Sequence, residues 1–524
     1  MNEHSKWTIM LYLAGDNDLS PEMVRAIIDI AKVGLPEDFA VTIQYDPILP
    51  SFPTFRYHIP AGEKPALKSH AGPIPLADAA EPVPGGENSS SPKVLTEFIA
   101  WSLEKAPSTH RMLVLSGHGS GAIGDFLKDD RAFGRFRSLS IPHLHAALSD
   151  AKQRAVNRRL LSSGDHLLHI LGMDSCLMST AEVAYQVRDA DSDSNGSLVQ
   201  YLVASEGFVP NAGWPFGYMF QQLKNKVDTN RSKPTSDRWK EDAESIAECL
   251  VNDSIDYYTT FTAASVSFDI SACELKRCDE LKSALRRLTN ELIGKGITAL
   301  GLTDEKIQDA VLLAHWRAQS FKFEQYTDLG DFCRLLEKST RGAYDGIADA
   351  AHIVNDAIDS VVGRSDALHK KGRQDSVGAE FQYASGLSVY FPWSLTAAPR
   401  EYLTDVHTHE FFPELKPYKE SRFSDETGWG EFLEKYLSST MRPVKDIGGE
   451  TVEALVVRFG MNGPAGRRFV EGTNKFVEGT NKFVEGTNKF QAGSNGGLSG
   501  SMKNPPQQAQ VDVQRLHQLR ELLV

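Results

Sequence analysis

The chain has 524 residues, of which 41% are hydrophobic and 24% are charged, and its formal net charge is -13. This composition is typical of a folded globular protein that is long enough for two or three folded units. The acidic balance, with no dense block of Lys and Arg, argues against nucleic acid as a direct ligand.

The first apolar run, at 7–15, is too short for a secretion signal or a membrane span. We therefore expect it to be a β-strand, and we expect a cytoplasmic protein with no membrane partner. The five cysteines are too few and too irregularly spaced for a disulfide framework, and the absence of a CxxC pair argues against structural zinc.

Short apolar runs alternate with amphipathic stretches through residues 1–225. The expected strands are 7–15, 40–46, 111–119, 167–176 and 198–206, and the expected helices are 20–34, 93–106, 140–153 and 177–189. This alternation predicts an α/β/α sandwich with a mostly parallel sheet. Residues 60–92 are rich in Pro, Gly and Ser and lack periodicity, so we expect a surface insertion there.

Residues 226–440 change to longer helical patterns, at 239–258 and 278–296, with strand-like runs at 265–271 and 385–393. They are predicted to form a second, α-rich domain. Residues 441–524 contain a linker, three FVEGTNK repeats and a short amphipathic C-terminal helix. Because Gly, Thr and Asn are poor helix formers, a flexible spacer is favoured over a coiled coil for the repeats.

Two chemically reactive side chains follow predicted strands. His118 lies in a glycine-flanked turn at the end of the strand-like run 111–119, and Cys176 ends the run 167–176. Open α/β sheets place their sites at the carboxyl ends of strands, so the two side chains are candidates for a nucleophile and its proton carrier. The backbone N–H groups of Gly119 and Cys176 are candidates for an oxyanion hole. The alternative is a buried core cysteine and a histidine that merely occupies a turn.

A different function class is suggested by residues 119–124, which match the GxGxxG pattern of dinucleotide-binding proteins. That motif should open a helix. The charged, glycine-broken segment that follows is a poor helix, so we discount a nucleotide site here.

Several motifs together resemble the clostripain-like cysteine peptidases, a family of the caspase-like clan. They are WTIMLYLAGDNDL at 7–19, LVLSGHGSG at 113–121, LGMDSCLM at 171–178, VASEGFVPNAGWPF at 203–216 and SGLSVYFPW at 385–393. The resemblance implies a caspase-like fold, a catalytic dyad of His118 and Cys176, and cleavage of peptide bonds after Arg or Lys.

The same resemblance implies an acidic specificity pocket, with Asp174 as its carboxylate. A carboxylate in a partly buried pocket suits a bidentate Arg partner. Glu206 is a second candidate for this pocket. The alternative for both residues is a structural carboxylate, such as a helix cap or a turn residue.

Members of this family are commonly made as latent precursors that are cut between the His and Cys strands. In this chain, Arg131, Arg135 and Arg137 lie in a non-periodic segment, 125–139, that we expect to be an activation loop cut by the enzyme itself or by an upstream protease. Some members depend on calcium, but no ligands can be assigned from the sequence. The proposed chemistry itself requires no metal or other cofactor.

The leading hypothesis is thus a cysteine endopeptidase that acts on proteins or peptides with Arg or Lys at the cleavage site. A prokaryotic defence or cell-death cascade would suit such an enzyme. The rival hypothesis is a non-catalytic binding or regulatory module of caspase-like fold that acts through its tail.

Overall fold

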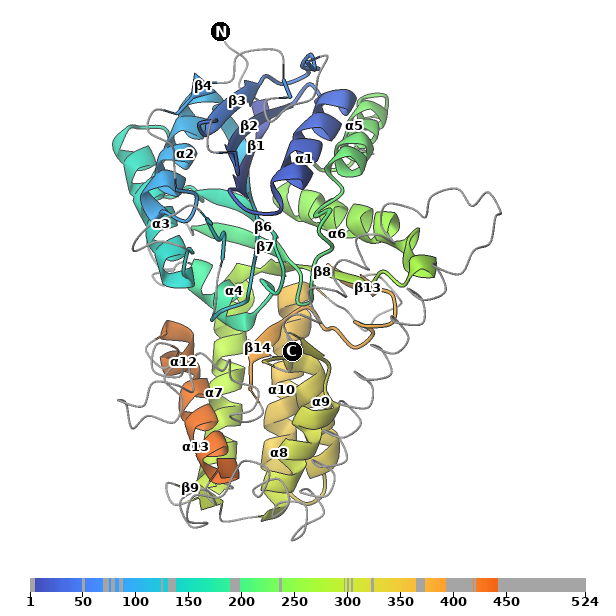
Figure 1. Cartoon of the computed structure of the whole chain (residues 1–524). Helices are drawn as coiled ribbons and strands as arrows, with labels where there is room; N and C mark the ends of the chain where they lie inside the picture. Colours follow the sequence, from blue (N-terminus) through green and yellow to red (C-terminus); the bar gives the residue numbers. More distant parts are fainter. Residues whose placement is uncertain are drawn as a thin grey trace, which may run out of the picture.

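The computed structural model describes residues 5–49, 52–68, 75–76, 81–83, 88–123, 126–130, 138–188, 198–234, 238–295, 297–298, 301–302, 305–321, 325–363, 373–392, 418 and 421–441. Nine strands form one central sheet in the order β13-β8-β7-β6-β5-β1-β2-β3-β4 (Figure 1). Their bounds are β1 Ser5–Gly15, β2 Phe39–Pro47, β3 Phe55–Ile59, β4 Glu81–Pro82, β5 Ser108–Ser116, β6 Leu168–Asp174, β7 Val199–Ala204, β8 Phe268–Glu274 and β13 Gln374–Val377.

The middle of the sheet is parallel. β1 pairs in parallel with β2 and β5, β5 with β6, and β6 with β7. The outer strands β3, β4, β8 and β13 pair antiparallel. All five strands expected in the first part of the sequence are present, and the predicted mostly parallel sheet is confirmed.

Side chains of β1 alternate between two hydrophobic cores, because successive residues of a strand point to opposite faces. Ile9 and Leu11 belong to one core, and Met10 and Tyr12 belong to the other. Helices α1, α5 and α6 lie on the first face, and α2, α3 and α4 lie on the second (Figure 1). Their bounds are α1 Ser20–Val33, α2 Pro92–Lys105, α3 Ile141–Asn157, α4 Ala181–Val187, α5 Phe216–Arg231 and α6 Ala243–Thr259.

Local sequence explains where two of these helices begin. Pro21 lies in the first turn of α1, where its missing N–H costs nothing, and Met23, Ile27 and Ile30 then form the buried stripe. The side chain of Ser140 accepts a hydrogen bond from the backbone N–H of His143 and so caps α3.

The remaining helices form an α-rich region below the central sheet in the view of Figure 1, next to α4 and β8. They are α7 Cys278–Lys295, α8 Glu305–Arg317, α9 Leu329–Thr340, α10 Asp345–Val362, α12 Arg422–Thr427 and α13 Trp429–Met441. Short strands accompany them, namely β9 Ile297–Thr298, β10 Gly301–Leu302, β11 Ser320–Phe321, β12 Tyr326–Asp328 and β14 Ser388–Tyr390. The buried side chains described in these helices and in β11, β12 and β14 belong to the same core as α2, α3 and α4.

The predicted domain boundary at residue 225 needs correction. Helix α5 runs across it, from Phe216 to Arg231. Strands β8 and β13 also come from the supposed second domain, yet they complete the central sheet because β8 pairs antiparallel with β7. The order of elements along the chain does not reveal that a late strand returns to an earlier sheet.

The predicted surface insertion at 60–92 is only partly exposed. Ser89 and Ser90 are buried, and the hydroxyl of Ser89 donates a hydrogen bond to Asp46 at the end of β2. The end of this segment therefore belongs to the body of the protein. The predicted linker beyond Met441, the FVEGTNK repeats and the C-terminal helix lie outside the described residues. Within the described residues, no helix is long and apolar enough to cross a membrane.

Candidate active site

His118 and Cys176 follow neighbouring strands at equivalent positions. β5 ends at Ser116 and β6 ends at Asp174, and these two residues are paired in the parallel register. Each candidate side chain comes two residues later. The backbone N–H of Gly117 donates to the carbonyl of Asp174 at 3.3 Å, which ties the two strand ends together. The expected proximity of the two strand ends is therefore confirmed.

Gly119 packs directly on the backbone of the cysteine segment. A Cβ atom at Gly119 would overlap the carbonyl oxygen of Cys176, and it would lie 2.9 Å from Cβ of Ser175 and 3.1 Å from the backbone nitrogen of Cys176. Glycine is therefore required here for close approach. The two backbones that carry the candidate oxyanion donors are thus neighbours.

The sulfur of Cys176 lies against the loop that follows β7. The backbone N–H of Val209 donates to Sγ at 3.3 Å, and the carbonyl oxygen of Val209 lies 3.7 Å from Sγ. The expected helix from 177 begins later, at Ala181, with Thr180 as its cap. Cys176 is therefore not at a helix N-terminus. Leu177 adopts a left-handed conformation with φ of 65°, which prevents a right-handed helix from beginning at Cys176.

His118 has a partner that the sequence argument did not assign to it. Its Nε2 lies 2.6 Å from Oδ1 of Asp18, in the turn between β1 and α1. The hydrogen bond to His118 lowers the pKa of Asp18 below its ordinary value. With Nε2 engaged, Nδ1 is the nitrogen left to exchange a proton with another group. Asp18 could have been suspected from its place at the carboxyl end of β1, the strand next to β5.

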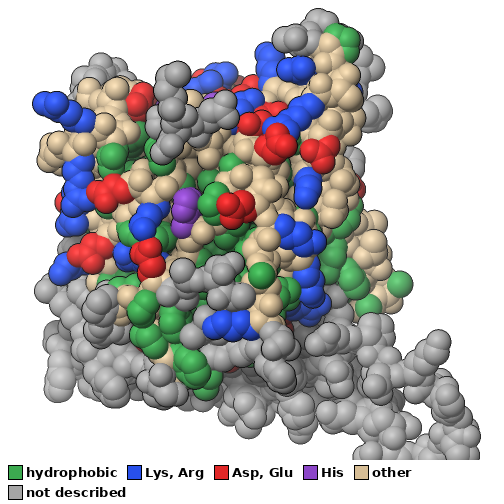
Figure 2. Space-filling view, turned by 90° about the horizontal axis from the view of Figure 1, so that it is seen from above, with side chains coloured by type: hydrophobic (Ala, Val, Ile, Leu, Met, Phe, Trp, Pro, Cys, Tyr) green, Lys and Arg blue, Asp and Glu red, His purple; other side chains and the backbone are tan. Residues whose placement is uncertain are grey.

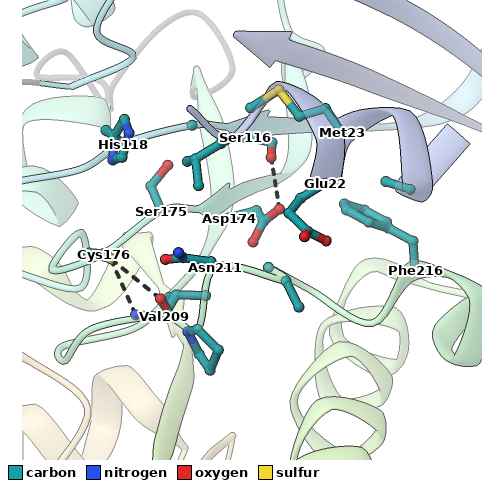
Figure 3. Close-up of a pocket in the computed structure, with 16 residues that line it drawn as sticks. Glu22, Met23, Ser116, His118, Asp174, Ser175, Cys176, Val209, Asn211 and Phe216 are labelled. Carbon is teal, nitrogen blue, oxygen red and sulfur yellow. Dashed lines mark hydrogen bonds between the residues drawn. The ribbon is translucent and has the colours of Figure 1, made fainter. Parts of the chain in front are cut away.

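A cleft opens between these elements (Figure 3). It has a volume of about 500 Å³, including open space at its mouth. Its apolar walls include Met23, Pro210 and Phe216, and its polar lining includes both His118 and Cys176.

Asp174 lies at the buried part of this cleft and is only 7% exposed. Its Oδ2 accepts a hydrogen bond from the hydroxyl of Ser116 at 2.8 Å, and its Oδ1 accepts one from the backbone N–H of Trp214 at 2.8 Å. Burial raises the pKa of Asp174 to about 6, although both hydrogen bonds oppose that shift. Because β6 ends at Asp174, strand alternation does not extend to Cys176, yet both residues line the same cleft.

Glu206 is not a pocket residue, and this expectation is corrected. Its side chain is fully buried away from the cleft, where Oε2 accepts a hydrogen bond from the backbone N–H of Gly386 at 2.7 Å. Burial, together with the nearby carboxylates of Asp328 and Asp269, raises the pKa of Glu206 well above its ordinary value. Strand β7 ends at Ala204, so Glu206 lies two residues beyond the strand. Its side chain is buried beside Asp269 of β8 and Asp328 of β12.

The segment after His118 contains no helix among its described residues, 119–123 and 126–130. The GxGxxG motif of a dinucleotide site should open a helix, and the described residues after Gly119 form none, so a nucleotide site here remains unsupported. Gly121 has φ of 81° and packs against the ring of Tyr326, which accounts for a glycine at this position. The expected processing residues Arg131, Arg135 and Arg137 lie outside the described residues.

Among the described residues, one acidic group has a spacing that suits a cation. It comprises Asp16, Asp46 and Asp129, which are all buried and whose nearest ligand atoms lie within 4.8 Å of one another. Burial raises the pKa of Asp46 to about 7, and the charge of Asp129 adds to that shift. Carboxylate oxygens are ligands that Ca²⁺ prefers.

Comparison with known proteins agrees with this geometry. The clostripain family model matches residues 74–436, which is more than half of the chain. The chain belongs to the clostripain family. Clostripain from Hathewaya histolytica is 24% identical over 334 residues, which cover 58% of this chain and 57% of that protein. The chain thus spans less than two thirds of the length of this curated relative.

Two solved structures of clostripain-family proteases share the fold. An inactive zymogen C11 protease from Parabacteroides distasonis aligns with a TM-score of 0.51 and 18% identity, covering 82% of this chain and 99% of that one. A secreted C11 cysteine protease from Bacteroides thetaiotaomicron aligns with a TM-score of 0.51 and 14% identity, covering 81% and 99% of the two chains. The mixed α/β fold with its large, mostly parallel sheet is that of the clostripain family.

Proposed function

We propose that this chain is a cysteine endopeptidase that cleaves after Arg or Lys, with Cys176 as nucleophile and His118 as proton carrier. The observation that supports this most is the shared cleft, in which a thiol and an imidazole from adjacent strand ends accompany a buried carboxylate. Membership of the clostripain family supports the same reaction.

In the proposed reaction, the thiolate of Cys176 attacks the carbonyl carbon of the scissile bond. The C–N bond then breaks, His118 donates a proton to the leaving amine, and an acyl-enzyme remains on sulfur. Water attacks this thioester, and the thiol is regenerated. The N–H groups of Gly119 and Cys176 are the proposed donors to the oxyanion, since their backbones lie side by side.

Asp174 is the proposed partner of the basic P1 side chain, which precedes the cleaved bond. Its carboxylate is buried in the cleft, and each of its oxygens keeps a free lone pair beside the hydrogen bond it already accepts. Above a pH of about 6 it is ionised, so it offers a negative charge in an environment that screens charge poorly.

Activation by cleavage after Arg131, Arg135 or Arg137 is also proposed. Both ends of that segment are held in place. The N–H of Asp130 donates to the carbonyl of Asp16, and the buried residues Phe126 and Leu139 are joined by a hydrogen bond from the N–H of Leu139 to the carbonyl of Phe126. A cut between these anchors would leave the fragments associated. N-terminal sequencing of fully active protein tests this, and an intact 125–139 segment in such protein would contradict it.

Four further expectations remain proposals. Calcium dependence, which the family resemblance implies for some members, would use Asp16, Asp46 and Asp129, the described carboxylates whose spacing fits a cation. The cytoplasmic location and the defence or cell-death setting are predictions from the sequence. An upstream activating protease is part of that same setting.

The experiment that tests the proposed activity uses a fluorogenic peptide amide with Arg next to the reporter group. Wild-type protein should release the reporter, and Cys176→Ala protein of equal melting temperature should not. Absence of hydrolysis by the wild type, before and after limited proteolysis, would favour the non-catalytic module instead.

A further inference from the structure

A second acidic side chain, Glu22, lines the same cleft as Asp174. Glu22 comes from the first turn of α1, whereas Asp174 comes from the end of β6. Figure 3 shows both carboxyl groups directed into the space in front of Ser116 and Phe216. Two elements that are distant in sequence thus bring two acids to one cavity.

The Oε2 atom of Glu22 is enclosed and accepts no hydrogen bond from the described residues. Asp174 differs, because each of its oxygens has a donor. An enclosed carboxylate oxygen without a donor loses its hydration and gains nothing in exchange. The Oε2 atom of Glu22 therefore lacks a hydrogen-bond donor that a bound ligand can supply.

The described lining of the cleft offers Glu22 no permanently charged cation, and its histidine, His118, is paired with Asp18. None of the residues that line it is Lys or Arg, and no described ion pair includes Glu22. A cation for this site must therefore arrive with the ligand. The apolar walls from Met23 and Phe216 suit the aliphatic part of a long basic side chain.

A purely helical role explains Glu22 less well. A carboxylate in the first turn of a helix benefits from the helix dipole, usually by accepting a hydrogen bond from a free N–H group. Backbone N–H groups at the start of α1 already have other acceptors. The N–H of Leu19 donates to the side chain of Asn17, and the N–H of Glu22 donates to the carbonyl of Leu19. The Oε2 atom of Glu22 accepts no such bond within the described residues.

We infer that Glu22 is a second specificity residue, which binds the P1 guanidinium together with Asp174 and makes Arg a better P1 residue than Lys. This rests on the proposed function. A guanidinium carries five N–H donors in one plane and can reach two carboxylates on different sides, whereas an ammonium concentrates its charge at one point. Glu22 thus determines which of the two basic side chains is preferred.

The test compares wild-type protein, Glu22→Gln and a control, Asp29→Asn, on two peptides that differ only in Arg or Lys at P1. Asp29 is on the same helix, outside the cleft, and forms exposed ion pairs with Arg25 and Lys32. For Glu22→Gln we expect kcat/KM on the Arg peptide to fall about 30-fold, the lower end of the range for loss of one partner of a buried charge pair. The Arg-to-Lys ratio of kcat/KM should fall about tenfold, and Asp29→Asn should match the wild type.

An unchanged Arg-to-Lys ratio in active Glu22→Gln protein would overturn the inference while leaving the proposed function intact. A wild type that shows no preference for basic P1 residues would overturn the proposed function itself. Inhibition of the wild type by agmatine and by cadaverine gives a second measurement that needs no folded variant. Agmatine, which carries a guanidinium, should bind more tightly, and equal or weaker binding would count against Glu22.

Discussion

The Nε2 atom of His118 lies 2.6 Å from Oδ1 of Asp18, which joins the turn after β1 to the turn after β5. Both side chains are exposed to solvent, at 40% for His118 and 58% for Asp18. Exposed charge pairs contribute about 1 kcal/mol or less. We therefore predict that Asp18→Ala lowers kcat by about 2- to 5-fold, by loosening the orientation of His118, while KM changes little. A loss as complete as that of His118→Ala would mean that Asp18 takes a direct part in the chemistry.

Because Gly119 packs directly on the backbone of Cys176, adding a single methyl group at this position should lower activity strongly. In Gly119→Ala, the new Cβ would overlap the carbonyl oxygen of Cys176, so the backbone must shift. We expect kcat/KM to fall by about 100-fold or more, because a proposed oxyanion donor moves with it. Gly164→Ala is the matched control, since its Cβ would meet no atom within 4 Å. Equal activities of the two variants would show that the Gly119 backbone has no role.

The pH dependence of pocket binding follows from Asp174. A cationic ligand binds the ionised carboxylate, and protonation of Asp174 competes with it. Because burial raises the pKa of Asp174 to about 6, binding should weaken as the pH falls through 6, instead of near 4 as for an ordinary Asp. The inhibition constant of benzamidine, measured between pH 5 and 8, should rise about tenfold per pH unit below 6. A flat profile over that range would exclude Asp174 as the pocket carboxylate.

Glu206 is predicted to act on stability and not on specificity. Its raised pKa favours the protonated carboxyl, which a glutamine imitates in shape and hydrogen bonding. Glu206→Gln should therefore keep the wild-type preference among Arg, Lys and Leu at P1. Glu206→Ala should lower the free energy of unfolding by about 1 to 3 kcal/mol, because the N–H of Gly386 loses its acceptor. A changed P1 preference in Glu206→Gln would return Glu206 to the pocket.

The sequence was a good guide to the sheet and to the two strand ends. Apolar runs predict the parallel strands, and a parallel register brings Ser116 and Asp174 together, so the residues two positions later line one cleft. Figure 2 shows acidic and basic side chains interspersed over one face of the described molecule, as expected from a composition without dense charge blocks.

Side-chain partners that depend on distant segments were harder to predict. Asp18 could be suspected only from its place after β1, and no local pattern distinguishes Glu22, on the helix that follows, from a solvent-exposed acid. Glu206, the second candidate for the pocket, lies just beyond β7. It stays outside the cleft because the returning strand β8 and the α-rich region enclose it, and no periodicity in the sequence reveals such long-range packing.

The most direct test of the account measures kcat/KM on three peptides that are identical except for Arg, Lys or Leu at P1. Wild-type protein should cleave the Arg and Lys peptides on the carboxyl side of the basic residue and leave the Leu peptide intact. Folded Cys176→Ala and His118→Ala should cleave none of them, because nucleophile and proton carrier act as one unit. Substantial hydrolysis by either variant, or equal cleavage of the Leu peptide by the wild type, would contradict the account.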